Sequence, residues 1–281
     1  MTELDKRLHA YRPDLADRRL KDRVTSGRFV EGHLMQVIDP LVAVHRAPRF
    51  DAMQISQALM GEKLRVFDVQ EGWAFAQLEH DGYVGYVSAD ALSAEVAEST
   101  HRVAVPSTFL FPAPDVKSQP AVIVTMNAAV AVTGGDEKFA QLSTGRFVYR
   151  QHLKKADEYE RDFVAVAEMF LHTPYYWGGK SVHGIDCSGL VQVSFEASGL
   201  ACPRDSDMQE ASLGNRLMVN DLDSLNRGDL VFWDGHVGIM KDDRTLLHAN
   251  GHHMKIVSEP LRTAVERIAA SGKSVTSIRR L

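Results

Sequence analysis

The chain has 281 residues, 44% of them hydrophobic, and a formal net charge of −5. A chain of this length can bury more than one hydrophobic core, so we expect two or three domains. The charged fraction of 25% argues against disorder, and the acidic balance argues against nucleic acid as a partner.

The sequence predicts no membrane-spanning segment and no secretory signal. The longest apolar stretch, residues 121–132, is interrupted by Thr125 and Asn127 and is shorter than the ~20 residues that span a bilayer. The first 22 residues are charged throughout and lack the apolar centre of a signal peptide. We therefore expect a cytoplasmic protein with no membrane partner and with its cysteines reduced.

The N-terminal half shows the patterns of small β domains. Residues 1–32 are polar with a broken stripe of leucines, which predicts a helical lead-in. Residues 33–98 form short alternating runs, and Asp81-Gly82 between two of them is a strong hairpin signal. Residues 99–153 show the same pattern of short alternating apolar runs. These patterns predict two small antiparallel barrels.

The pattern changes in residues 154–281. Apolar residues at helical spacing predict a helix over 154–172, ended by Pro174, and a second helix that begins at Cys187 and is closed by Gly199. Four short strands follow, in "GDLVFW", "HVGIMKD", "RTLLHAN" and "MKIVSEPL". Helices first and an antiparallel sheet after them predict an α+β domain.

The candidate chemistry lies in this last domain. A thiol at the start of a helix meets unpaired backbone N–H groups and the positive end of the helix dipole, which predicts a lowered pKa for Cys187. His236 and His248 lie on two predicted strands that pairing would bring together. A helix packed on that face would add the thiol and complete a Cys-His-His set of nucleophile, base and orienting group.

Each of these residues also has an ordinary structural interpretation. A lone cysteine is commonly a small buried hydrophobe, and we assign this role to Cys202. A strand histidine is commonly a hydrogen-bonded structural residue, and His252 and His253 follow a glycine in a predicted solvated turn. Neither cysteine has the spacing of a zinc site, so we expect no metal and no cofactor.

The ordered set of motifs decides between these interpretations. "TPYYWGGKSVHGIDCSGLVQ", "CPRDSDMQ", "RGDLVFWDGHVGIM" and "LLHAN" together closely resemble the NlpC/P60 family of cell-wall peptidases, compact relatives of the papain-like cysteine peptidases. The segment "GEKLRVFDVQEGWAFAQLEHDGYVGYV" resembles a bacterial SH3 module. The resemblance implies a papain-like α+β domain, with helices packed on an antiparallel sheet, preceded by two SH3-like barrels.

The resemblance also implies catalytic roles. Cys187 matches the family's nucleophile, His236 its general base and His248 the polar residue that orients the base. Tyr175 matches a tyrosine that polarises the substrate carbonyl or holds the oxyanion, with the backbone N–H of Cys187 as a second donor.

Further positions match residues that contact the substrate. Asp186 matches an aspartate that binds the free α-amine of an L-Ala residue, as suits a carboxylate facing an ammonium group. Ser188 and Ser206 match serines that contact D-Glu. Arg204 has two open roles, pairing with a substrate carboxylate or forming a structural ion pair.

The first SH3-like module is expected to complete the amine pocket. Tyr83 matches a tyrosine that closes this pocket, with Tyr86 as the alternative. The family often has an acidic residue before a Thr/Ser-Gln pair, where this chain has Met53 near that position and Asp51 two residues earlier. The sequence leaves open whether Asp51 replaces it.

The arrangement of two such modules before an NlpC/P60 domain resembles that of the γ-D-glutamyl-L-diamino acid endopeptidases, which recycle murein peptides. The implied substrate is a peptide L-Ala-γ-D-Glu-diamino acid with a free amine, where the diamino acid is lysine or diaminopimelate. The alternatives are a non-catalytic protein that binds murein peptides and an amidase or acyltransferase on the same papain-like core.

Overall fold

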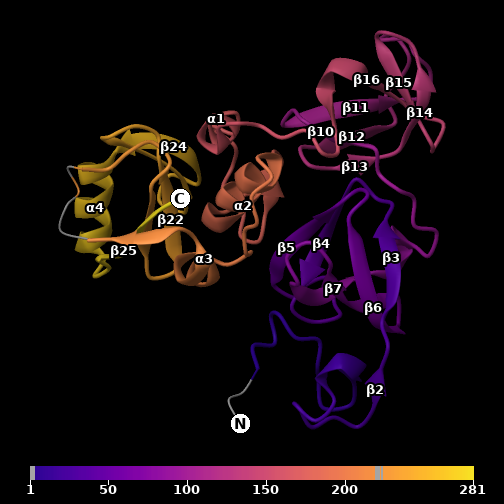
Figure 1. Ribbon diagram of the computed structural model, residues 1–281, viewed down its shortest axis with the longest axis horizontal. Helices are drawn as coiled ribbons and strands as arrows, with labels where there is room; N and C mark the ends of the chain where they lie inside the picture. The colour runs from indigo at the N-terminus through magenta and orange to yellow at the C-terminus, as the bar shows by residue number, and fades with distance from the viewer. Residues whose placement is uncertain (1–3, 219–221, 223) are drawn as a thin grey trace. The chain divides into compact units, whose positions relative to one another are not determined.

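The computed structural model describes residues 4–218, 222 and 224–281. By its internal contacts the chain divides into two compact units, residues 1–158 and 159–281 (Figure 1). The division falls close to residue 154, where the sequence pattern changes from alternating to helical. No helix in the described residues is long and apolar enough to cross a membrane.

The first unit begins with a small barrel made of one seven-stranded antiparallel sheet. Leu59, Leu64 and Leu78 point into its core and are fully buried. The hairpin predicted at Asp81-Gly82 is confirmed, since it joins two paired strands and Gly82 has the positive φ of 74° that such turns require. In spatial order the strands are β5 (Gln54–Leu59), β4 (Leu41–His45), β8 (Val84–Ser88), β7 (Trp73–Leu78), β6 (Lys63–Gln70), β3 (His33–Val37) and β9 (Leu92–Ser93), with a 3₁₀ turn, η2 (Ala89–Ala91), before β9.

The N-terminal segment differs from its prediction. Residues 4–32 contain no α-helix but have a two-stranded parallel pair, β1 (Ala16–Asp17) and β2 (Phe29–Val30), with a 3₁₀ turn, η1 (Arg18–Leu20), between them. The helical expectation was wrong for these residues because their apolar side chains are used by the barrel. Two of them, Ala10 and Leu15, are buried in one cluster with three barrel residues, Phe67, Phe75 and Val84.

A second small barrel follows in the same unit. It has a five-stranded and a three-stranded antiparallel sheet around a core of its own that includes Val103, Leu110, Val124 and Val148. The elements are β10 (His101–Val103), β11 (Ser107–Phe111), β12 (Val122–Thr125), β13 (Ala129–Val130), β14 (Val132–Gly135), β15 (Phe139–Leu142), β16 (Phe147–Tyr149), η3 (Arg150–His152) and β17 (Leu153–Lys155).

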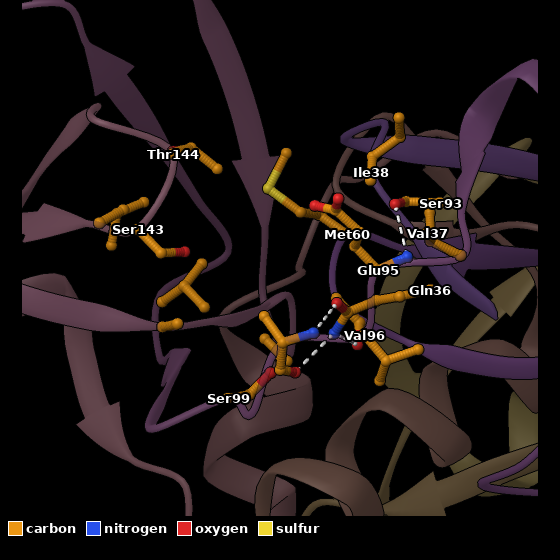
Figure 2. A pocket seen from close by; sticks show the side chains of 16 residues that line it. Gln36, Val37, Ile38, Met60, Ser93, Glu95, Val96, Ser99, Ser143 and Thr144 are labelled. Carbon is orange, nitrogen blue, oxygen red and sulfur yellow. Dashed lines mark hydrogen bonds between the residues drawn. The ribbon is translucent and has the colours of Figure 1, made fainter. Parts of the chain in front are cut away.

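The two barrels of the first unit meet closely at Gly61. The Ala129 backbone N–H donates to the Met60 carbonyl at 2.8 Å, and a Cβ added to Gly61 would lie 2.1 Å from the Ala129 carbonyl oxygen. A cavity of about 610 Å³ lies beside this contact (Figure 2). The buried Gln36 side chain fixes one wall, because it bonds to the backbone of both Gly61 and Ala97.

The second unit is an α+β domain, as predicted. A six-stranded antiparallel sheet has α1 and α2 on one side and α4 on the other (Figure 1). Its strands in spatial order are β20 (Asn215–Leu217), β25 (Val275–Arg280), β21 (Leu230–Trp233), β22 (His236–Met240), β23 (Thr245–Asn250) and β24 (Lys255–Pro260). The other elements are α1 (Phe163–Glu168), β18 (Lys180–Ser181), β19 (Gly184–Ile185), α2 (Cys187–Ala197), α3 (Ser206–Ser212) and α4 (Leu261–Ala270).

The two predicted helices have different outcomes. The helix expected over 154–172 is shortened to α1, because the Asp162 side chain accepts from the N–H groups of Val164 and Ala165 and so starts the helix there. The helix expected at Cys187 is confirmed, and Gly199, with φ of 72°, lies just beyond its end.

Candidate active site

The candidate nucleophile is the first residue of a buried helix. Cys187 begins α2, and the side chain of Asp186 before it caps the helix by accepting from the Gly189 N–H at 2.7 Å. The α2 helix packs against β22 and β23. This places the thiol beside the strands that carry the two histidines.

A network around Asp186 holds the cysteine in place. The two Asp186 oxygens accept five hydrogen bonds, from the N–H groups of Gly178 and Gly189, the Ser188 hydroxyl and two guanidinium nitrogens of Arg204. Arg204 also donates to the Ser188 hydroxyl at 2.8 Å and is only 1% exposed. A carboxylate has room for about four or five donors, so Asp186 has no free acceptor position.

This network bears on three predicted substrate contacts. Arg204 forms the structural ion pair that was one of its two open roles. Ser188 lies inside the same buried network. The geometry therefore supports a structural role for Asp186, and its contact with a substrate amine stays a prediction.

The sheet opens where the thiol lies. β22 pairs with β23 only through Ile239 and Met240, so the pairing ends before Val237. The backbone N–H groups of Val237 on β22 and of Ser188 on α2 each act to lower the pKa of the Cys187 thiol. The sulfur therefore lies close to the backbone of both a strand and a helix.

The thiol nevertheless has a raised pKa, in contrast to the prediction from the helix dipole. Burial, with the negative charge of Asp186 next to it, raises the pKa of Cys187 to about 12. The backbone donors and Arg204 act in the opposite direction but are outweighed. The prediction was wrong because a helix start lowers a thiol pKa only when the thiol remains partly solvated.

The two histidines are directly linked, as the strand pattern predicted. His236 Nε2 and His248 Nδ1 lie 2.8 Å apart. Burial, together with the neighbouring His248, lowers the pKa of His236 to about 3, and burial also lowers the pKa of His248. The two nitrogens lie at hydrogen-bonding distance, so one of the two rings donates a proton to the other.

Sequence reasoning missed Glu259. Its Oε1 lies 2.8 Å from Nε2 of His248, and the Arg267 guanidinium on α4 pairs with the same oxygen. The register pairs Glu259 with Leu246, two residues before His248 and on the same face. Its place in the predicted strand "MKIVSEPL" was a usable signal, but only with the register of that hairpin known.

Tyr175 lies beside the nucleophile. Its backbone N–H bonds to the Met254 carbonyl at 3.0 Å, and it forms a bridge with Ile185. Burial, and then the nearby charges of Cys187 and Asp186, raise the pKa of the half-buried Tyr175 hydroxyl. The hydroxyl therefore keeps its proton and is available as a donor.

The other predicted residues of this unit occupy distinct places. Ser206 is half-buried at the start of α3. Cys202 is buried and accepts from the Gln209 side-chain amide at 3.3 Å, which confirms its structural interpretation. His252 and His253 are exposed in a turn, as predicted.

Three predicted residues belong to the first unit. Tyr83 is 3% exposed, and its backbone N–H donates to Asp81. Tyr86 is half-buried, with its ring 5.2 Å from that of Phe75. Asp51 is exposed and 3.4 Å from Arg49. Their roles in an amine pocket stay predictions.

Comparison with known proteins identifies the two kinds of domain. The NlpC/P60 family model matches residues 172–269, and the model of the bacterial dipeptidyl-peptidase SH3 domain matches residues 44–92. The chain carries a bacterial SH3 domain followed by an NlpC/P60 peptidase domain. The resemblance drawn from the sequence motifs is thereby confirmed.

Relatives align along most of the chain. It is 25% identical over 240 residues to the gamma-D-glutamyl-L-lysine dipeptidyl-peptidase of Bacillus cereus, covering 74% of this chain and 71% of that protein. It is 28% identical over 215 residues to the protein of the same name from Bacillus subtilis, covering 69% of this chain and 71% of that protein.

A solved structure confirms the fold. The crystal structure of an NlpC/P60 family protein from Bacillus cereus matches with a TM-score of 0.74 at 19% identity, covering 88% of this chain and 99% of that chain. The chain therefore has the fold of an NlpC/P60 protein, with the α+β domain expected from its motifs.

The buried ion pair gives a stability prediction. Arg204→Met leaves the Asp186 carboxylate buried without its counter-ion, and we expect a loss of about 3–5 kcal/mol in the free energy of unfolding. Arg227→Met, which breaks a more exposed ion pair with Asp162 and Glu168, should cost at most about 1 kcal/mol. Denaturant unfolding of the full chain measures both, and equal losses would contradict the assignment.

The raised thiol pKa gives a kinetic prediction. The thiolate is the reactive form, so iodoacetamide should alkylate Cys187 about tenfold faster per pH unit from about pH 6 to pH 9. Peptide mapping by mass spectrometry follows Cys187, and Cys202→Ala controls for the second thiol. A rate that is constant over this range would instead show a thiolate already present at neutral pH.

Proposed function

We propose that this protein is a cysteine endopeptidase that hydrolyses the bond between γ-D-Glu and the L-diamino acid of murein peptides. The observation that carries the proposal is the hydrogen-bonded pair of His236 and His248 beside a thiol at the start of a buried helix. The names of both aligned relatives support the γ-D-glutamyl bond as the target. A protein that only bound peptide would not need a linked base at a thiol, which favours catalysis over a binding role.

The first step is attack by sulfur on the γ-carbonyl carbon of D-Glu. At rest, burial favours the neutral thiol and the neutral imidazole. The thiol proton moves to His236 as the carbon–sulfur bond forms, because the developing charge then lies on the substrate oxygen and not on a buried sulfur. Tyr175 and the Cys187 N–H are the donors proposed for that oxyanion.

The second half of the reaction releases two products. His236 gives its proton to the nitrogen of the diamino acid as the carbon–nitrogen bond breaks, which leaves a thioester on Cys187. Water then attacks the thioester carbon, with His236 taking one of its protons, and returns the thiol. No step requires a metal or cofactor.

The substrate is proposed to carry a free N-terminal L-Ala. A dipeptidyl-peptidase releases two residues from a free N-terminus, so the names of the relatives support this choice. Ser206, half-buried at the start of α3, is the predicted D-Glu contact that lies outside the network around Asp186. Released murein peptides would then be cut, whereas glycan-linked stems would not, which suits a role in peptide recycling in the cytoplasm.

Mass spectrometry tests this proposal. We expect the wild-type protein to release L-Ala-D-Glu from L-Ala-γ-D-Glu-diaminopimelate, and from its lysine counterpart if both diamino acids are accepted. Cys187→Ala should release none, because no other group supplies the nucleophile. The same peptide with an acetylated amine is the control for recognition of the free N-terminus.

Two results would contradict the proposal. Equal cleavage of the acetylated and free peptides would remove the requirement for the free amine. If the wild-type protein cuts neither peptide, the γ-glutamyl assignment fails, and the binding protein or the acyltransferase becomes the better description.

A further inference from the structure

The hydrogen bonds of the site continue past the Cys-His-His set. His248 is hydrogen-bonded to Glu259 on β24, and Glu259 is in turn hydrogen-bonded to Arg267 on α4. His248 is 1% exposed, so its ring nitrogens have protein groups and not bulk water as hydrogen-bond partners. The arrangement therefore fixes which nitrogen of each ring carries a proton.

The ionised carboxylate of Glu259 determines which group donates and which accepts in each of these hydrogen bonds. Glu259 is ionised, since His248 and Arg267 lower its pKa to about 2 against the opposing effect of burial. An ionised carboxylate only accepts, so Nε2 of His248 must carry a proton and donate it. Nδ1 of the neutral His248 is then an acceptor.

The same logic extends to His236. Its Nε2 lies 2.8 Å from the acceptor Nδ1 of His248 and must therefore be the donor. Nδ1 of His236 is left with its lone pair. This is the nitrogen that can accept the thiol proton.

A competing donor makes the choice depend on Glu259. The side-chain nitrogen of Asn250 also lies 3.0 Å from Nε2 of His248. Its amide orientation is set by the His253 N–H, which donates to the Asn250 oxygen at 2.8 Å. With the carboxylate present, Nε2 donates to Glu259 and the Asn250 amide stays beside it without donating, since a charge-assisted bond is the stronger one.

We propose that Glu259 is a positioning residue, which sets the tautomers of His248 and His236 so that Nδ1 of His236 is free to accept the proton of Cys187. The proposal deepens the proposed function, because the base it orients is the one in that reaction. Arg267 holds the Glu259 carboxylate from the α4 side. The hydrogen-bonded residues thus extend from His236 on the sheet to Arg267 on α4, which lies on the opposite side of the sheet from α2.

Removal of the Glu259 carboxylate should exchange donor and acceptor in the hydrogen bond between His248 and His236. In Glu259→Met, the Asn250 amide becomes the partner of Nε2 and donates to it. His248 then carries its proton on Nδ1 and donates to Nε2 of His236, which places the remaining proton of His236 on Nδ1. That tautomer cannot accept the thiol proton.

The conservative variant should keep the wild-type arrangement. In Glu259→Gln, Arg267 requires an acceptor and so holds the amide oxygen in the place of Oε1. This oxygen also accepts from Nε2 of His248. Glu168→Met is the matched control, since it removes another glutamate paired with an arginine in the same unit.

The experiment measures the tautomers directly in the full chain. Long-range ¹H–¹⁵N correlation spectra of the labelled protein report which ring nitrogen is protonated, with His236→Asn and His248→Asn used for assignment. We expect protonated Nε2 of His236 in wild type, Glu259→Gln and Glu168→Met, and protonated Nδ1 in Glu259→Met.

One rate completes the experiment. The kcat on the murein peptide should fall about 10²- to 10⁴-fold in Glu259→Met, as expected when a base has the wrong tautomer. Thermal melting identifies any variant whose loss is due to unfolding. A purely structural role would lower stability without moving the proton from Nε2 to Nδ1.

The outcomes separate this proposal from the proposed function. If Glu259→Met keeps the Nε2 proton of His236 and a kcat within about twofold of wild type, Glu259 does not position the base. If no murein peptide is cut by wild type but the tautomer reverses in Glu259→Met, the proposed substrate fails and the role of Glu259 stands.

Discussion

One buried carboxylate holds the nucleophile in position. Asp186 accepts from the loop at Gly178, from the first turn of α2 and from Arg204, which lies well beyond the helix in sequence. A buried charge is costly unless it is paired and hydrogen-bonded, and here all its positions are filled. Because the residue next to Asp186 is Cys187, the place of the sulfur is fixed by the same bonds that satisfy the charge.

Burial then sets the electrostatics of the reaction. It raises the pKa of the thiol and lowers that of the imidazole, so the two groups meet as a neutral pair. In the proposed reaction, charge appears only as the substrate is attacked, and Tyr175 is the donor proposed to stabilise it. The site is thus suited to the transition state and not to storing a thiolate. The proposed role of the Glu259 carboxylate is to determine which nitrogen of each histidine ring bears a proton.

The sequence was informative where local patterns decide the structure. Helix periodicity after Cys187, strand alternation around His236 and His248, and the Asp81-Gly82 turn all predicted what the structure contains. These features depend on neighbours in sequence or on one strand pairing. The order of the motifs added the family and with it the fold of the domain.

Long-range packing decided what the sequence did not predict. Ala10 and Leu15 join the core of the first barrel, which overrides the helical pattern of the N-terminal segment. The pKa of Cys187 depends on how deeply α2 is buried. Glu259 reaches His248 only through the register of β23 and β24, which no single run of letters contains.

The central claim is that Cys187 carries the acyl group during turnover. The most direct measurement is to quench the wild-type protein with acid while it is turning over L-Ala-γ-D-Glu-diaminopimelate, and to map the trapped adduct by mass spectrometry. The account predicts an L-Ala-D-Glu thioester on the peptide that contains Cys187. An acyl group found on any other residue would contradict it.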